Sequence, residues 1–149
     1  ALPWLAGAVC ATLGGAACDR LCRRIGPRWG CRAPAIAGLV LAGGFLLAGV
    51  LAADPRVAVL ILSICFGCTQ LTEGSYWAGM SLVAGRHTSP ATGILNTGGN
   101  LGGVISTPII PVLVERIGWG PSLATGTLFA LAGAALWLLV EVDRPLAAE

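Results

Sequence analysis

Charged residues are scarce in this sequence of 149 residues: only 11% are Asp, Glu, Lys or Arg, whereas 56% are hydrophobic. Soluble domains carry about 25% charged residues. This composition therefore excludes an ordinary water-soluble domain and indicates that lipid covers the hydrophobic side chains. Lysine is absent, every basic residue is Arg, and the net charge is only +2. The Arg residues form no basic block of the kind that binds nucleic acid.

The cysteines lack the features of a disulfide framework or of a structural metal site. Cys65 and Cys68 form a C-x-x-C pair without the βαβ context of a redox motif. Cys18, Cys22 and Cys31 flank an Arg-rich stretch, but they lack the second close ligand pair of a structural zinc site. The sequence therefore predicts that these thiols are small packing residues, with no metal and no cofactor.

Long apolar runs predict an all-α integral membrane protein with about five transmembrane helices, because about 20 apolar residues span a bilayer. The expected helices cover residues 1–18, 34–53, 57–84, 91–114 and 121–140. Short connections separate them, and the longest comprises residues 19–32. The sequence opens inside an apolar run and shows no signal peptide, so we expect a fragment of a longer membrane protein.

The placement of Arg predicts the orientation in the membrane, because cytoplasmic loops carry an excess of basic residues. The side expected to be cytoplasmic holds Arg20, Arg23, Arg24, Arg28, Arg32, Arg86 and Arg144. The opposite side holds only Arg56 and Arg116. We therefore expect a multi-pass protein of the cell (inner) membrane with its C-terminus in the cytoplasm.

Residues 69–80 lie deep inside the apolar run 57–84 and contain its only acid, Glu73. At helical spacing, Thr69, Glu73, Tyr76 and Met80 share one stripe, and Gln70 and Trp77 lie beside it. An ionisable group near the bilayer midplane costs at least about 2.5–3.5 kcal/mol, so it marks a functional site by default. The alternative is an acid that is paired, or kept neutral, inside the helix bundle.

A second polar stretch lies within residues 89–111. Asn96 and Asn100 share one helical face with Gly99, Gly103 and Thr107. The G-x-x-x-G pairs predict a tight helix-packing face, and the two amides are either cavity-lining groups or hydrogen-bonding groups between helices. We expect the amides to line a cavity and the glycines to pack.

Residues 15–24 carry the spacing G-x-x-x-D-R-x-x-R-R, formed by Gly15, Asp19, Arg20, Arg23 and Arg24. This pattern resembles the loop signature of the major facilitator superfamily, which lies between the second and third helices and again between the eighth and ninth. A Gly is frequent in that signature where Cys22 stands here. The resemblance implies a conformational-switch loop and assigns residues 1–149 to helices eight to twelve, part of one six-helix bundle.

The stretch TGILNTGGNLGG, followed by a Pro, resembles the eleventh helix of the anion:cation symporter branch, which includes sugar-acid, phthalate and sialin-like transporters. Tyr76-Trp77-Ala78 similarly resembles the tenth helix of that branch. The resemblance implies that Asn96, Trp77 and a polar residue just before it contact an organic anion. The expected cavity residues are Gln70, Glu73, Ser75, Tyr76, Trp77, Asn96 and Asn100.

The resemblance implies proton-coupled secondary transport of a small organic anion, such as a sugar acid or another carboxylic acid, by the full-length protein. Its partners would be the anion, protons, the lipid bilayer and the N-terminal bundle. Glu73 departs from the branch pattern, and an ionised Glu73 would repel an anion. The alternatives are drug/proton antiport and a non-transport membrane enzyme or accessory subunit, although the sequence shows no nucleophile–base pair or metal cluster that would indicate an enzyme.

Overall fold

The computed structural model describes residues 1–144, and these residues form helices and turns without any strand. In chain order the elements are α1 (Leu2–Ile25), α2 (Pro27–Leu51), α3 (Pro55–Gln70), α4 (Glu73–Ala84), the 3₁₀ turn η1 (Gly85–His87), α5 (Thr88–Ile117) and α6 (Trp119–Leu136). The all-α prediction is therefore confirmed for the described chain. The last five residues, which belong to the tail assigned to the cytoplasm, lie outside it.

Three helical stretches within residues 1–144 are long and apolar enough to cross a membrane. They are Leu2–Ile25, Pro27–Leu51 and the 63-residue stretch Pro55–Ile117, which combines α3 to α5. This stretch contains two of the five expected spans. The helices thus support a membrane protein, although they meet the prediction of five separate spans only in part.

The first connection is much shorter than we expected from the sequence. Residues 19–32 were expected to form the longest loop, but α1 continues to Ile25 and α2 begins at Pro27, with only Gly26 between them. Arg23 and Arg24 occupy the last turn of α1, where cations interact favourably with the helix dipole. Pro27 suits the first helical position because it needs no amide donor there. Hydropathy identified the apolar parts of these two helices, residues 1–18 and 34–53, but α1 extends beyond the first part and α2 begins before the second.

The expected helix over residues 57–84 is also interrupted. α3 ends at Gln70 and α4 begins at Glu73, with a turn at Leu71 and Thr72. The Thr72 hydroxyl donates a hydrogen bond to the Thr69 carbonyl at 2.6 Å. Side-chain bonds of this kind compete with the regular helical pattern. The interruption lies immediately before the acid that the sequence analysis identified as functional.

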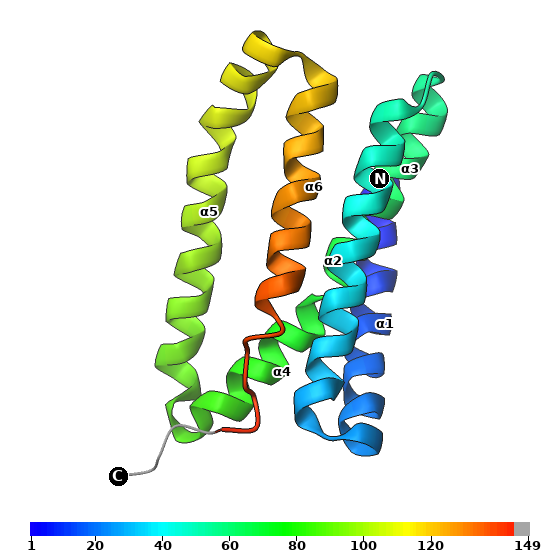
Figure 1. Ribbon diagram of the computed structural model, residues 1–149. Coiled ribbons are helices and arrows are strands. Elements are labelled where there is room, and N and C mark those ends of the chain that lie inside the picture. Colours follow the sequence, from blue (N-terminus) through cyan, green and yellow to red (C-terminus); the bar gives the residue numbers. More distant parts are fainter. Residues whose placement is uncertain (145–149) are drawn as a thin grey trace.

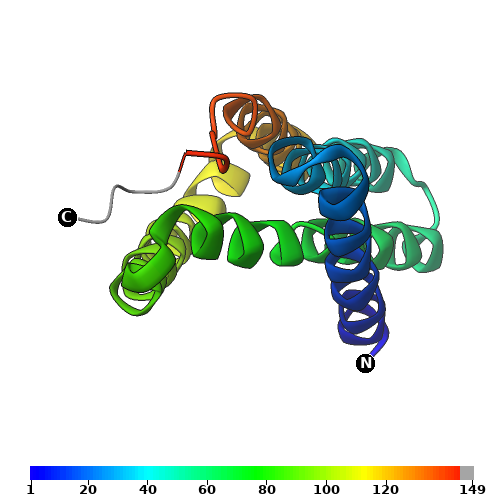
Figure 2. The ribbon, with the colours of Figure 1, turned by 90° about the horizontal axis from the view of Figure 1, so that it is seen from below.

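α2 lies at the centre of the molecule and packs against α1, α3 and α6. α3 and α4 run obliquely to the foot of α5, and α5 and α6 form a hairpin whose α6 arm lies against α2 (Figure 1). The view from below shows α5 standing apart from the α1–α3 group (Figure 2). Accordingly, no residue of α5 is buried.

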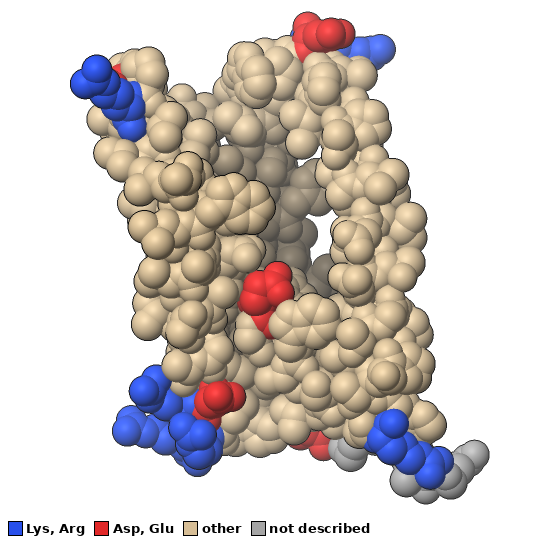
Figure 3. Space-filling view, turned by 180° about the vertical axis from the view of Figure 1, so that it is seen from behind, with Lys and Arg blue, Asp and Glu red and all other residues tan. Residues whose placement is uncertain are grey.

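Large apolar side chains are exposed over most of the described surface. Trp4 is 76% exposed and Phe129 is 78% exposed, as expected where lipid rather than water surrounds a helix. Basic and acidic side chains gather at the two ends of the molecule, and acidic atoms are also visible about midway between them (Figure 3). This distribution indicates a membrane location.

Candidate functional site

A cavity of about 640 Å³ lies between α4 and α5. It is lined by Glu73, Tyr76 and Trp77 of α4 and by Ile94, Leu95, Asn96, Gly98, Gly99 and Asn100 of α5. Its size falls in the usual range of small-molecule sites, about 300–1,000 Å³. The structure therefore brings together five of the seven residues that were expected to form a cavity.

Glu73 and Trp77 form the polar centre of the α4 wall. The Trp77 indole Nε1–H donates a hydrogen bond to Glu73 Oε2 at 2.9 Å, across the four-residue spacing that places side chains on one helix face. Glu73 also occupies the first turn of α4, where the helix dipole favours a negative charge. The described lining of the cavity contains no basic side chain that would pair with Glu73.

Asn96 and Asn100 supply the amides of the α5 wall. They lie four residues apart on one face of α5, and both side chains are exposed. Neither side-chain amide has a hydrogen-bond partner among residues 1–144. Each amide thus offers one acceptor and two donor hydrogens to a molecule in the cavity.

Two of the expected cavity residues lie elsewhere. Ser75 is fully buried, and its hydroxyl has no hydrogen-bond partner. Gln70 is half-buried and lies against α1 near Gly7. Both residues are close to the cavity in sequence, but the helical rotation turns them toward α1 and α2 rather than toward α5. Their assignment to the substrate cavity stays a prediction that this geometry does not favour.

A close approach between α1 and the turn at residues 71–72 positions the acidic end of α4. A Cβ atom on Gly14 would overlap the Leu71 carbonyl oxygen, and one on Gly74 would lie 2.5 Å from Gly15 Cα. Only glycine permits backbones to lie this close. The sequence analysis noted Gly15 but not its contact with the chain around Glu73. In the sequence, the break between α3 and α4 coincides with the polar residues between Thr69 and Glu73.

The predicted packing role of the α5 glycines finds no partner among the described residues and stays a prediction. A Cβ on Gly98, Gly99, Gly102 or Gly103 would meet no atom within 4 Å. No described helix therefore approaches these glycines closely, although α5 does contact α4, η1 and α6. Any tight packing on these glycines must involve a partner outside the described residues.

The motif at the end of α1 is exposed. Asp19, Arg20, Arg23 and Arg24 are all on the surface, and Gly15 is half-buried. Arg20 donates to the Ala16 carbonyl at 3.4 Å, whereas Asp19 forms no ion pair and no helix cap within residues 1–144. The structure thus places these residues together but leaves their expected switch role a prediction.

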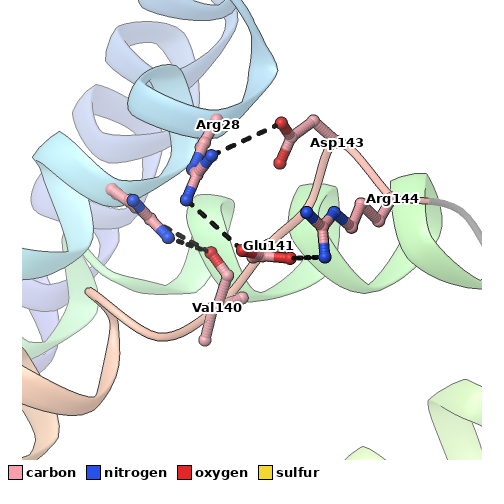
Figure 4. Close-up of polar contacts among 6 residues, drawn as sticks. Arg28, Val140, Glu141, Asp143 and Arg144 are labelled. Carbon is pink, nitrogen blue, oxygen red and sulfur yellow. Dashed lines mark hydrogen bonds and ion pairs between the residues drawn. The ribbon is translucent and has the colours of Figure 1, made fainter.

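A set of contacts that the sequence analysis missed joins the end of the described chain to the start of α2 (Figure 4). Arg32, which is only 4% exposed, donates from Nε and one terminal nitrogen to the Val140 carbonyl at 3.0 and 2.7 Å. Arg28 lies 3.5 Å from Glu141 and 3.8 Å from Asp143. We call these contacts the tail clamp. The acidic residues Glu141 and Asp143 were the only sequence feature that could have indicated these contacts. The sequence does not reveal their partner, because Arg28 lies more than 100 positions away.

The comparisons with known proteins add one strong similarity. No family model matches this chain. The probable sulfoacetate transporter SauU of Cupriavidus necator is 34% identical to it over 151 aligned residues. The alignment covers 97% of this chain but 35% of the relative, so the chain spans about a third of the length of that protein. The similarity supports a membrane transporter.

Proposed function

We propose that this chain forms helices eight to twelve of a secondary active transporter of the major facilitator superfamily, in the anion:cation symporter branch. The proposal is supported by the similarity to a transporter along 97% of the chain, the long apolar helices, and the Asp19–Arg24 motif at the end of α1. The rest of the transporter would supply the N-terminal bundle. That bundle would face the exposed glycines of α5 and close the cavity.

The substrate that the cavity suits best is a small organic anion, and the single observation that carries this proposal is the lining of the α4–α5 cavity. Asn96 and Asn100 line the cavity together with Tyr76 and Trp77, and each amide carries N–H donors. Carboxylate and sulfonate oxygens accept such donors. The name of the similar protein specifies sulfoacetate, so we propose a carboxylate or sulfonate of comparable size as the substrate here.

Glu73 provides the route to proton coupling. An ionised carboxylate in the cavity would repel an anion, whereas a protonated one would offer an O–H donor to it. We propose that the anion binds together with a proton held on Glu73, and that both are released when the bundles rock to the other side. The hydrogen bond from Trp77 would hold the carboxyl in place in both protonation states. No covalent chemistry is needed.

The Glu73→Gln substitution in the full-length transporter tests this proposal, because glutamine imitates the neutral acid but cannot release a proton. In proteoliposomes we expect exchange of labelled anion for unlabelled anion to persist, while net uptake driven by an inward proton gradient falls by at least about tenfold. Glu115→Gln is the matched control, since Glu115 is an exposed acid at the end of α5. Proton-driven uptake that is equal in both variants would contradict the assignment.

Drug/proton antiport is the second candidate, and one observation favours it. Glu73 is an acid in a cavity whose described lining contains no basic residue, and such an acid attracts cations. The same proteoliposomes distinguish the two functions. Proton-driven export of an organic cation without any anion uptake would establish antiport and overturn the symport proposal.

A further inference from the structure

Cys18, Cys22 and Cys31 converge at the junction of α1 and α2, although their spacing in the sequence predicted packing residues rather than a structural zinc site. The three sulfur–sulfur distances are 3.7 Å for Cys18–Cys31, 3.8 Å for Cys22–Cys31 and 3.9 Å for Cys18–Cys22. Each sulfur is therefore a neighbour of both others, at nearly equal distances. The described cysteines outside this cluster, Cys10, Cys65 and Cys68, form no such triangle.

These distances match the ligand geometry of a thiophilic cation. With a Zn–S bond of about 2.3 Å, sulfur ligands at the corners of a tetrahedron lie about 3.8 Å apart. A disulfide would require a sulfur–sulfur distance of about 2.05 Å, so none of the three pairs is bonded. We propose that Cys18, Cys22 and Cys31 form a three-thiolate site for one thiophilic divalent cation of the zinc type.

The backbone brings the thiols together without distortion. Cys18 and Cys22 lie one helical turn apart on α1, and Cys31 lies in the first two turns of α2. Gly30 allows this approach, because a Cβ atom there would lie 2.5 Å from both the Cα and the sulfur of Cys22. The hairpin at Gly26 thus presents all three sulfurs to one point.

The surroundings suit a bound metal and provide access to it. Cys18 and Cys31 are 1% and 0% exposed, respectively, whereas Cys22 is half-buried and opens the cluster to the outside. The side chain of the fully buried Ser75 lies beside Cys18. Three protein ligands leave a fourth coordination position open, which a water can occupy.

Binding would replace three S–H bonds with three metal–sulfur bonds and release three protons, because thiolates rather than thiols ligate metals. A site with one divalent cation and three thiolates carries one net negative charge. Arg23 and Arg24 follow in the same hairpin and would offset that charge. Since the metal would join α1 to α2, we expect it to stabilise the hairpin that carries the Arg20–Arg24 motif. This inference does not rest on the proposed transport function.

The test titrates the reduced, metal-free, membrane-inserted protein in nanodiscs with Cd²⁺, following the ultraviolet thiolate-to-metal charge-transfer band. We expect saturation at one Cd²⁺ per chain and competition by Zn²⁺. Cys18→Ser, Cys22→Ser and Cys31→Ser should each weaken Cd²⁺ binding by more than about tenfold. Cys10→Ser, Cys65→Ser and Cys68→Ser are matched controls and should bind normally. Absence of saturable binding, or equal losses in the control variants, would overturn the proposal.

A second measurement uses the unsubstituted protein and therefore does not depend on the folding of any variant. Zn²⁺ should protect the half-buried Cys22 from maleimide, as located by mass spectrometry, while the labelling of the half-buried Cys10 is unchanged. If Zn²⁺ leaves the labelling of Cys22 unchanged, the metal site is excluded. A disulfide between two of the three cysteines, found in protein isolated directly from its membrane, would also overturn the proposal in favour of a redox bond.

Discussion

At the scale of single residues, Glu73 is held by an indole donor rather than by a cation. The Trp77 N–H bond at 2.9 Å orients the carboxyl, and the cavity lining contains no Arg. A carboxylate paired with Arg resists protonation, because the cation favours the charged form. The described cavity lining offers Glu73 no such Arg partner, which is compatible with the proposal that this residue carries a proton during transport.

Asn96 provides the sharpest residue-scale test of the α5 wall. Asn96→Ala removes an amide that we propose donates to the anion, and such hydrogen bonds to charged groups contribute about 1.5–3 kcal/mol. We expect the apparent KM for the anion to rise by roughly 10- to 100-fold in uptake assays. Thr97→Ala is the control, since Thr97 neighbours Asn96 but does not line the cavity. Equal effects of both substitutions would remove Asn96 from the site.

Arg32 provides a second residue-scale test, directed at the tail clamp. Arg32→Met removes two charge-assisted hydrogen bonds to the Val140 carbonyl, so we expect a loss of about 1.5–3 kcal/mol in stability. Thermal unfolding of the wild-type and Arg32→Met proteins in detergent measures this loss of stability. Arg32→Lys should recover only part of the loss, because lysine lacks the planar guanidinium fork.

The exposed Arg24→Met is the control for the tail clamp. Arg24 lies in the last turn of α1 and makes no contact with the end of the described chain. If Arg24→Met destabilises the protein as much as Arg32→Met does, the effect comes from charge at this end of the molecule and not from the clamp.

At the scale of elements, the α3–α4 turn decides where the acid lies. The turn at Leu71 and Thr72 starts a new helix at Glu73, and the glycines of α1 hold that turn against the bundle. Interrupted helices near the bilayer midplane are a recurring feature of transporter sites. Here the interruption is secured by a neighbouring helix, so changes in α1 should act on the cavity.

Gly14→Ala tests this coupling between elements. The added Cβ would overlap the Leu71 carbonyl, and overpacking of this kind costs about 1–3 kcal/mol. We expect a lower thermal unfolding temperature and, in the full-length transporter, reduced uptake. Gly44→Ala is the control, because a Cβ on that mid-helix glycine of α2 meets no atom within 4 Å. Wild-type stability of Gly14→Ala would show that α1 does not hold the turn.

At the scale of the whole molecule, the distribution of Arg predicts the topology. One end carries the Arg residues of the α1–α2 hairpin together with Arg86, and the opposite end carries Arg56 and Arg116. Reporter fusions after His87 should therefore show cytoplasmic activity, and fusions after Gly118 should show activity outside the cytoplasm. The reverse pattern would invert the proposed orientation and the direction in which the cavity opens.

The whole molecule also has an incomplete surface. No residue of α5 is buried. The glycines of α5 at positions 98, 99, 102 and 103 contact no described helix. The chain spans about a third of its transporter relative, and a second bundle is the partner that the proposed function requires. Cross-linking between residues on this face and the remainder of the full-length protein would show that contact directly.

The sequence by itself determined the properties that depend on local composition. Apolar runs predicted the helices and their membrane location, and Glu73 was identified as the only acid in one of those runs. The resemblance to a transporter branch singled out Trp77 and Asn96. Helical periodicity placed Glu73, Tyr76 and Trp77 near one another on one helix and Asn96 with Asn100 on another, because side chains three or four positions apart share a face whatever surrounds the helix. Both groups line the same cavity.

Only the tertiary structure decided which residues from distant segments meet. The helix break before Glu73 is held by a backbone contact with α1, and Arg32 binds a carbonyl more than 100 positions away. Three cysteines that were predicted to be packing residues converge at one hairpin. The position of Ser75, away from the cavity, was settled in the same way. Hydropathy and periodicity describe one helix at a time, whereas these features arise from how closely, and in which rotation, one helix packs against another.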